Sequence, residues 1–93
     1  MIKHIVLYNL KPDVDKEASV KLIASLLEPL VGQIPGLQHL EIRRAYNGVD
    51  YALYSEFESR EALSAYAVHP LHLAAKEQFF HLLDKRVAAD YDL

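Results

Sequence analysis

The chain has 93 residues, of which 52% are hydrophobic and 25% charged, and its formal net charge at pH 7 is −3. This composition is typical of one globular domain, and the negative charge argues against nucleic acid or an anionic membrane as a partner, since both are bound through basic surfaces. The chain has no cysteine, which excludes disulfides, thiolate metal sites and cysteine nucleophiles.

No targeting or membrane-spanning segment is visible in the sequence. The apolar run Ile5-Val6-Leu7 is too short for a signal peptide, and no run approaches the length of a membrane span. We therefore expect a cytoplasmic protein.

The first half of the chain predicts a strand, a helix and a strand. The opening segment MIKHIVLYNL is rich in β-forming residues. Apolar residues then recur at the spacing of an amphipathic helix, namely Val20, Ile23, Leu27 and Leu30. Residues 37–46 alternate apolar and charged side chains, which indicates a strand with one exposed face. The pair Asn47-Gly48 favours a tight hairpin turn into a returning strand over residues 51–58.

The second half predicts a broken helix and a last strand. Ser59 is suited to cap a helix at its N-terminus. Pro70 ends that helix, because it forces His69 out of helical geometry, and it is well placed to begin another. Residues 85–91 then form a short strand.

The resulting order β-α-β-β-α-β predicts an α+β ferredoxin-like sandwich, with helices on one face of an antiparallel sheet. In the first strand, alternation places Ile2, His4, Val6 and Tyr8 toward the helices. The outer face collects the remaining apolar residues, Ile5, Leu7, Tyr54, Val87, Ala89 and Tyr91. Because the helices cover only one face, we expect the outer faces of two copies to pack together in a homodimer, a dimeric α+β barrel. The alternative is a sheet with a partly apolar exposed face.

The segment AYAVHPLH, residues 65–72, carries the candidate chemistry. The helix break brings Tyr66, in the last turn before it, toward His72, in the first turn after it. A helix N-terminus disfavours a nearby cation, so we expect His72 to be a neutral imidazole that can accept a proton. Tyr66 could donate a hydrogen bond to an enolate, and His4 is a third candidate on the helix-facing side of its strand. Such a set suits proton abstraction next to a carbonyl.

Each of these residues also has a purely structural interpretation. Tyr66 and His4 could be satisfied core residues, and His69 could act only as a cap. A zinc site of His4, His69 and His72 is an alternative, but the H-P-L-H spacing is not a one-face i,i+4 pair, and we expect no metal. Phosphate loops and dinucleotide fingerprints are absent, so we expect no cofactor. His39 and His81 lie among polar neighbours and are predicted at the surface.

Several segments resemble the stress-responsive A/B barrel (Dabb) domain: IKHIVL, YALYSEFES, REAL, SAYAVHPLH and the final ADY. The resemblance extends over the chain, residues 1–93, and implies a dimeric α+β barrel with ferredoxin-like subunits. The family is functionally mixed. It includes plant stress proteins and a plant cyclase that forms olivetolic acid by a cofactor-free aldol closure of a linear polyketide.

The resemblance also implies roles for individual residues. His72 would accept a proton, Tyr66 would hold and polarise the substrate, and His4 would line the pocket. The rest of the expected pocket is Val6, Tyr8, Leu27, Leu53, Ala75, Phe79 and Asp90. Leu27 and Ala75 stand where the cyclase has bulkier aromatic residues, so the synthesis of olivetolic acid itself is not expected. Some plant members hold a divalent cation on backbone carbonyls, and the matching segment here contains Val31, Ile34 and Leu37.

Two classes of function therefore remain open. The first is a cofactor-independent lyase or cyclase that transfers a proton on a β-keto or polyketide-like small molecule. The second is a non-enzymatic homodimer that binds a small molecule or protects under stress. A cofactor-free oxygenase of a related barrel family is a third alternative.

Overall fold

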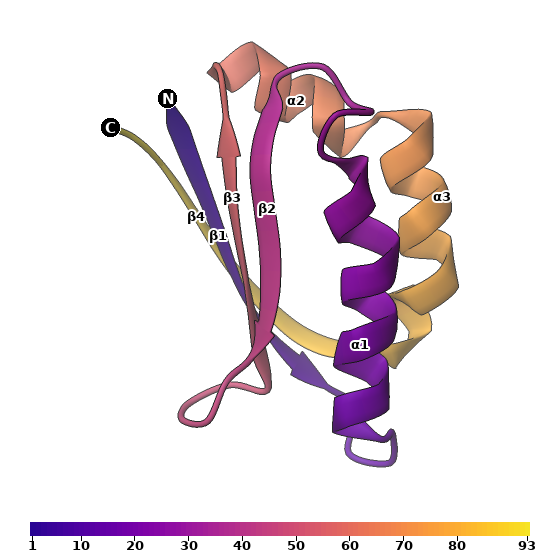
Figure 1. The fold of residues 1–93 in the computed structure, drawn as a ribbon. Coiled ribbons are helices and arrows are strands. Elements are labelled where there is room, and N and C mark those ends of the chain that lie inside the picture. The colour runs from indigo at the N-terminus through magenta and orange to yellow at the C-terminus, as the bar shows by residue number, and fades with distance from the viewer.

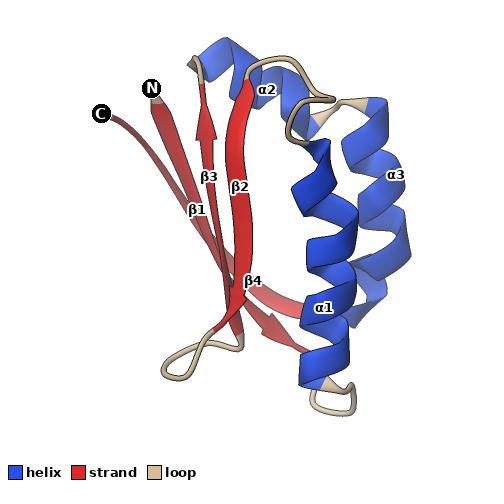
Figure 2. Ribbon diagram, in the orientation of Figure 1, coloured by secondary structure: helices blue, strands red, loops and turns tan.

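The computed structural model describes residues 1–93 as a four-stranded antiparallel sheet with helices on one face (Figures 1 and 2). The elements in chain order are β1 (Ile2–Leu10), α1 (Lys16–Leu27), β2 (Leu37–Arg44), β3 (Tyr51–Phe57), α2 (Arg60–Ala67), α3 (Pro70–Phe79) and β4 (Leu83–Asp92). Short 3₁₀ helices, η1 (Glu28–Leu30) and η2 (Phe80–Leu82), follow α1 and α3. The strand order β2-β3-β1-β4 confirms the predicted ferredoxin-like fold. None of the helices combines the length and apolar character needed to cross a membrane.

The helices begin at residues that satisfy their free N–H groups. Asp15 accepts from the N–H of Ala18 at 2.9 Å and caps α1. Ser59 accepts from Ala62 at the start of α2, as predicted. At α3, Nδ1 of His69 accepts from the N–H of Leu71 at 3.1 Å. The start of α3 after the break is thus stabilised by the fixed ring of Pro70 and by the His69 cap.

The connection between β2 and β3 is longer than predicted. Six residues, 45–50, separate the strands, and the N–H of Ala45 donates to the carbonyl of Asp50 at 3.1 Å. Of the pair Asn47-Gly48, only Gly48 has a positive φ, whereas a two-residue type I′ turn needs two such residues. The predicted tight hairpin was therefore wrong. The carboxylate of Asp50 instead ties the loop to β1 by accepting from the N–H of Leu10 at 2.8 Å.

Gly36 allows the loop before β2 to approach α2. Its φ is +84°, and a Cβ added at this position would lie 2.5 Å from the Cβ of Ala62. Its carbonyl accepts from the N–H of Glu58 at 2.9 Å. The loop therefore fits against the start of α2 only with glycine here.

The two faces of the sheet differ as predicted. Ile2, Val6 and Leu10 of β1 are buried under the helices. On the other face, Ile5 lies opposite Tyr54 and Ala89, and Leu7 lies opposite Val87. No helix covers this outer face in Figure 1, and Val87 is 67% exposed. β4 is an edge strand whose residues after Leu83 are all exposed.

Candidate functional site

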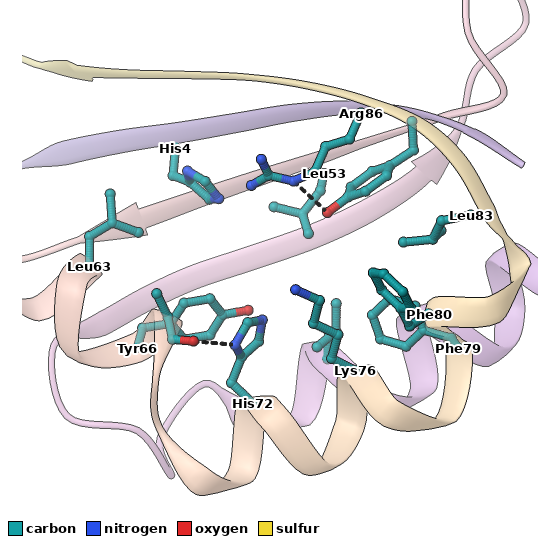
Figure 3. Close-up of a pocket in the computed structure, with 13 residues that line it drawn as sticks. His4, Leu53, Leu63, Tyr66, His72, Lys76, Phe79, Phe80, Leu83 and Arg86 are labelled. Carbon is teal, nitrogen blue, oxygen red and sulfur yellow. Dashed lines mark hydrogen bonds between the residues drawn. The ribbon is translucent and has the colours of Figure 1, made fainter.

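A pocket of about 140 Å³ opens between the inner face of the sheet and the corner formed by α2 and α3 (Figure 3). Nine of its 13 lining residues are hydrophobic. Seven of the 13 lining residues are predicted site residues, and they come from five elements: His4, Tyr8, Leu27, Leu53, Tyr66, His72 and Phe79. The three proposed chemical groups thus border one cavity.

The rings of Tyr66 and His72 are in contact across the helix break. Their centroids lie 4.2 Å apart, at an interplanar angle of 34°. Tyr66 also packs against Phe57 of β3 with a centroid distance of 5.0 Å, and it is only 4% exposed. The sheet therefore fixes Tyr66, and Tyr66 in turn supports the imidazole.

The backbone sets the tautomer of His72. Its Nδ1 lies 3.3 Å from the carbonyl oxygen of Ala67. Because a carbonyl can only accept, Nδ1 carries the proton in this bond and Nε2 is left with its lone pair in the neutral ring. In Figure 3 the ring nitrogen that does not take part in this bond faces the pocket. Burial lowers the pKa of His72, and the nearby Lys76, His4 and Arg86 lower it further, against the effect of the bond to Ala67.

The hydroxyl group of Tyr66 is directed into the same pocket (Figure 3). It makes no hydrogen bond to another protein group, whereas the hydroxyl groups of Tyr8 and Tyr54 each have one. Burial raises the pKa of the Tyr66 phenol. The group is therefore a protonated hydrogen-bond donor at neutral pH, available to a ligand.

His4 is held by Asp90 across the β1–β4 pair. The two residues lie opposite each other in register, and Nδ1 of His4 is hydrogen-bonded to Oδ1 of Asp90. The ring of His4 also lies edge-on to Phe57 at a centroid distance of 6.2 Å. A carboxylate on Nδ1 orients the ring and leaves Nε2 as the free nitrogen.

Three residues expected in the pocket do not line it. Val6 is completely buried within the sheet–helix core, and Ala75 is 6% exposed in the same core. Asp90 acts on the site only through His4.

Six further lining residues were not anticipated: Leu63, Ala67, Lys76, Phe80, Leu83 and Arg86. The sequence contained a signal for two of them. Lys76 follows His72 by four residues and so shares its helix face. Arg86 alternates with Ala88 and Asp90 along β4, so all three share its inner face, and Arg86 lies opposite Tyr8 of β1.

The residues of the alternative zinc site do not converge. His69 uses Nδ1 to cap α3, and no three histidine, aspartate or glutamate side chains are arranged to hold a metal ion. Both His39 and His81 are exposed, as predicted.

The segment expected to offer carbonyls to a divalent cation does not fit that role well. The carbonyl of Ile34 already accepts from the N–H of Leu37 at 3.3 Å. Leu37 itself belongs to β2, and the set of Val31, Ile34 and Leu37 includes no carboxylate, which calcium and magnesium sites usually have.

Comparisons with known proteins agree with this architecture. The family model of the stress responsive A/B barrel domain matches residues 2–93. A stress-response A/B barrel domain-containing protein of Arabidopsis thaliana is 31% identical over 96 residues, which cover 97% of this chain and 87% of that protein.

Solved structures show the same fold. A dimeric protein of unknown function with a ferredoxin-like fold from Bacteroides fragilis is 31% identical, with a TM-score of 0.89 and coverage of 99% of this chain and 95% of that chain. A dimeric ferredoxin-like protein from Thermobifida fusca is 27% identical, with a TM-score of 0.83 and coverage of 99% and 90%. A hydroxynitrile lyase from Passiflora edulis has a TM-score of 0.81 with coverage of 97% and 90%, but at 19% identity it shares the fold alone.

Proposed function

The chain belongs to the stress-responsive A/B barrel domain family, and we propose that its pocket binds a small carbonyl compound and moves a proton at the carbon next to the carbonyl without a cofactor. The observation that carries this proposal is the state of His72. Its Nδ1 is occupied by the carbonyl of Ala67, and its free nitrogen faces the cavity that Tyr66 also borders.

The reaction begins when Nε2 of His72 takes a proton from the carbon next to the substrate carbonyl. The C–H bond breaks, its electron pair moves toward the carbonyl, and an enolate forms. The Tyr66 hydroxyl donates a hydrogen bond to the enolate oxygen, where the negative charge develops. The largely hydrophobic lining strengthens this bond relative to one made in bulk water.

The enolate can then follow two courses. It can regain a proton from His72, which exchanges the carbon-bound hydrogen with solvent. It can also attack a second carbonyl of the same molecule. A C–C bond then forms and closes a ring, the π bond of that carbonyl breaks, and its oxygen takes the proton back from His72. A β-keto or polyketide-like substrate provides both an acidic C–H bond and a second carbonyl.

A second candidate function is binding without turnover. It is favoured by the packing of Tyr66, which contacts Phe57 as well as His72 and is almost completely buried. In that case the same groups hold a ligand or support a stress-protective dimer, and no proton is transferred.

We further propose that the protein is a homodimer formed through the outer face of the sheet. This face carries apolar residues that no helix covers, among them Leu7 at 39% and Val87 at 67% exposure. Two neighbours of the same fold, at 31% and 27% identity, are described as dimeric.

A hydrogen-exchange experiment tests the proton transfer. The methyl ester of β-benzoylpropionate, a stable aryl ketone, is incubated in D₂O with the protein, and NMR follows the loss of the hydrogens next to the ketone. We expect exchange above the buffer rate, reduced about 100-fold or more in His72→Gln. His81→Gln is the control, because His81 is exposed and does not line this pocket. Binding of the ester without His72-dependent exchange would favour the non-enzymatic alternative, and neither binding nor exchange would overturn the proposal.

A further inference from the structure

The charged residues of the pocket all have the same sign. Lys76 and Arg86 line it, and no aspartate or glutamate does. The chain as a whole carries a formal charge of −3, so this local excess of positive charge runs against the composition of the protein. Asp90, which does not line the pocket, is hydrogen-bonded to His4.

Lys76 reaches the pocket from the helix side. It lies one turn after His72 on α3, and in Figure 3 its ammonium group is directed into the space between the helix and the sheet. Its only interaction beyond the backbone is with the ring of Phe80, whose centroid lies 5.4 Å from Nζ. It forms no ion pair with a carboxylate.

Arg86 approaches from the sheet side. Its Nε donates to the hydroxyl of Tyr8 at 3.4 Å, and Tyr8 stacks on Tyr51 at a centroid distance of 4.8 Å. The aromatic pair thereby supports one edge of the guanidinium. Its terminal N–H groups have no protein acceptor and remain available.

The other arginines of the chain differ in this respect. Arg43, Arg44 and Arg60 each form an ion pair, with Glu28, Glu17 and Asp92 respectively. Arg86 is thus the one arginine without a carboxylate partner.

Lys76 and Arg86, two unpaired cations beside an apolar cavity, repel each other and lower the affinity of His72 for a proton. A bound anion would relieve both effects.

From this arrangement we propose that the substrate of the pocket is an anionic carbonyl compound, a keto acid whose carboxylate lies between Lys76 and Arg86. This inference rests on the proposed function for the carbonyl end of the molecule, which lies at Tyr66 and His72. The apolar body fills the cavity, and the carboxylate occupies the side where α3 faces β4. Lys76 and Arg86 then determine which carbonyl compounds bind, and His72 transfers the proton.

The test compares one ligand with and without its charge. β-Benzoylpropionate and its methyl ester share the aryl ketone and differ at the carboxylate, and their affinities are measured by calorimetry. We expect the acid to bind about tenfold more tightly than the ester. We expect Lys76→Gln combined with Arg86→Gln to remove the difference between acid and ester and to leave the affinity of the ester within about twofold. We expect Arg86→Lys to retain part of the difference. High salt should weaken binding of the acid more than binding of the ester.

Lys11→Gln combined with Lys21→Gln is the matched control, because both residues are exposed lysines that do not line the pocket. This double variant also removes two positive charges, and it should leave both affinities unchanged. Equal affinities for acid and ester in the unaltered protein, no binding of the acid, or an unchanged affinity for the acid in the variant that lacks both Lys76 and Arg86 would each overturn the inference.

Proton exchange on the ester separates the proposed anion site from the proposed proton transfer. His72-dependent exchange without preference for the acid defeats the anion site alone, whereas a cation-dependent preference without exchange defeats the proton transfer alone.

Discussion

The rings of Tyr66 and His72 lie 4.2 Å apart, centroid to centroid, although five residues and the end of one helix separate them in the chain. Pro70 makes this possible, because it begins α3 directly after His69 has left helical geometry. An uninterrupted helix would place residues six apart on different faces. The break is therefore what assembles the pair over the inner face of the sheet.

Removing the hydroxyl of Tyr66 should affect chemistry far more than stability. Tyr66→Phe keeps the packing against Phe57, and no protein hydrogen bond is lost with the hydroxyl group. We expect hydrogen exchange on the ester to fall about tenfold or more, since a donor to the enolate is lost, and the melting temperature to stay nearly unchanged. A large loss of stability together with unaltered exchange would instead show that the hydroxyl is structural.

The pH dependence of exchange should follow the neutral form of His72. Burial and nearby cations lower its pKa below the ordinary value of 6.5, so the ring is unprotonated at neutral pH. We expect the exchange rate to be constant near pH 7 and to fall only as the pH drops through this lowered pKa. Lys76→Gln removes one of the cations and should move the midpoint to higher pH. An NMR titration of the imidazole measures both midpoints, and an unchanged midpoint in the variant would contradict the assigned cause.

The same group links stability to pH. The pKa of His72 is lower in the folded protein than in the unfolded chain, so protonation favours unfolding. The stabilisation is present above about pH 6.5 and is lost as the pH falls through the folded value. Urea unfolding at several pH values should show this loss in the unaltered protein and a smaller one in His72→Gln. If the free energy of unfolding falls equally with pH in the two proteins, groups other than His72 cause the loss.

Gly36 should tolerate substitution less well than the other glycines. Gly36→Ala must place a Cβ against the Cβ of Ala62 at a positive φ, which should lower the free energy of unfolding by about 2–4 kcal/mol. Gly48 has a similar φ of +89° but no atom near its Cβ position, so Gly48→Ala should cost about 1–2 kcal/mol. Urea unfolding measures the free energy of unfolding of both variants, and the difference between their losses gives the contribution of the clash with Ala62. Equal losses would show that the approach to α2 is not tight.

The dimer proposal predicts sensitivity to charge on the outer face. Leu7 and Val87 lie opposite each other there, and a pair of lysines, Leu7→Lys with Val87→Lys, should produce a monomer in sedimentation velocity. Leu22→Lys is the control, since Leu22 of α1 is 40% exposed, close to the 39% of Leu7. A double variant that still sediments like the unaltered protein would place the interface elsewhere.

The fold could be predicted because its signals are local. The alternation in β1 separated His4 and Val6 from Ile5 and Leu7, and Ser59 and Pro70 marked helix ends through their own chemistry. The hairpin was wrong because Asn47-Gly48 favours a tight turn only when both residues adopt positive φ, and the bonds of Asp50 to β1 favour a longer loop.

The site was predicted only in part, because its walls depend on strand register and on how the core packs. Tyr66, His72 and His4 could be placed in one pocket from the topology. Val6 and Ala75 share faces with pocket residues, but they are buried in the core and do not line the cavity. Arg86 reaches it because β4 pairs with β1 so that Arg86 lies opposite Tyr8, and that register depends on contacts between the two ends of the chain.

Proton transfer by His72 is tested most directly by the rate at which the protein exchanges the hydrogens next to the ketone of methyl β-benzoylpropionate, compared between the unaltered protein and His72→Gln at pH 7. We expect exchange above the buffer rate that falls about 100-fold or more in His72→Gln, with an unchanged rate in His81→Gln. Exchange that proceeds equally in both histidine variants, or no exchange from the unaltered protein while it binds the ester, would contradict proton transfer by His72.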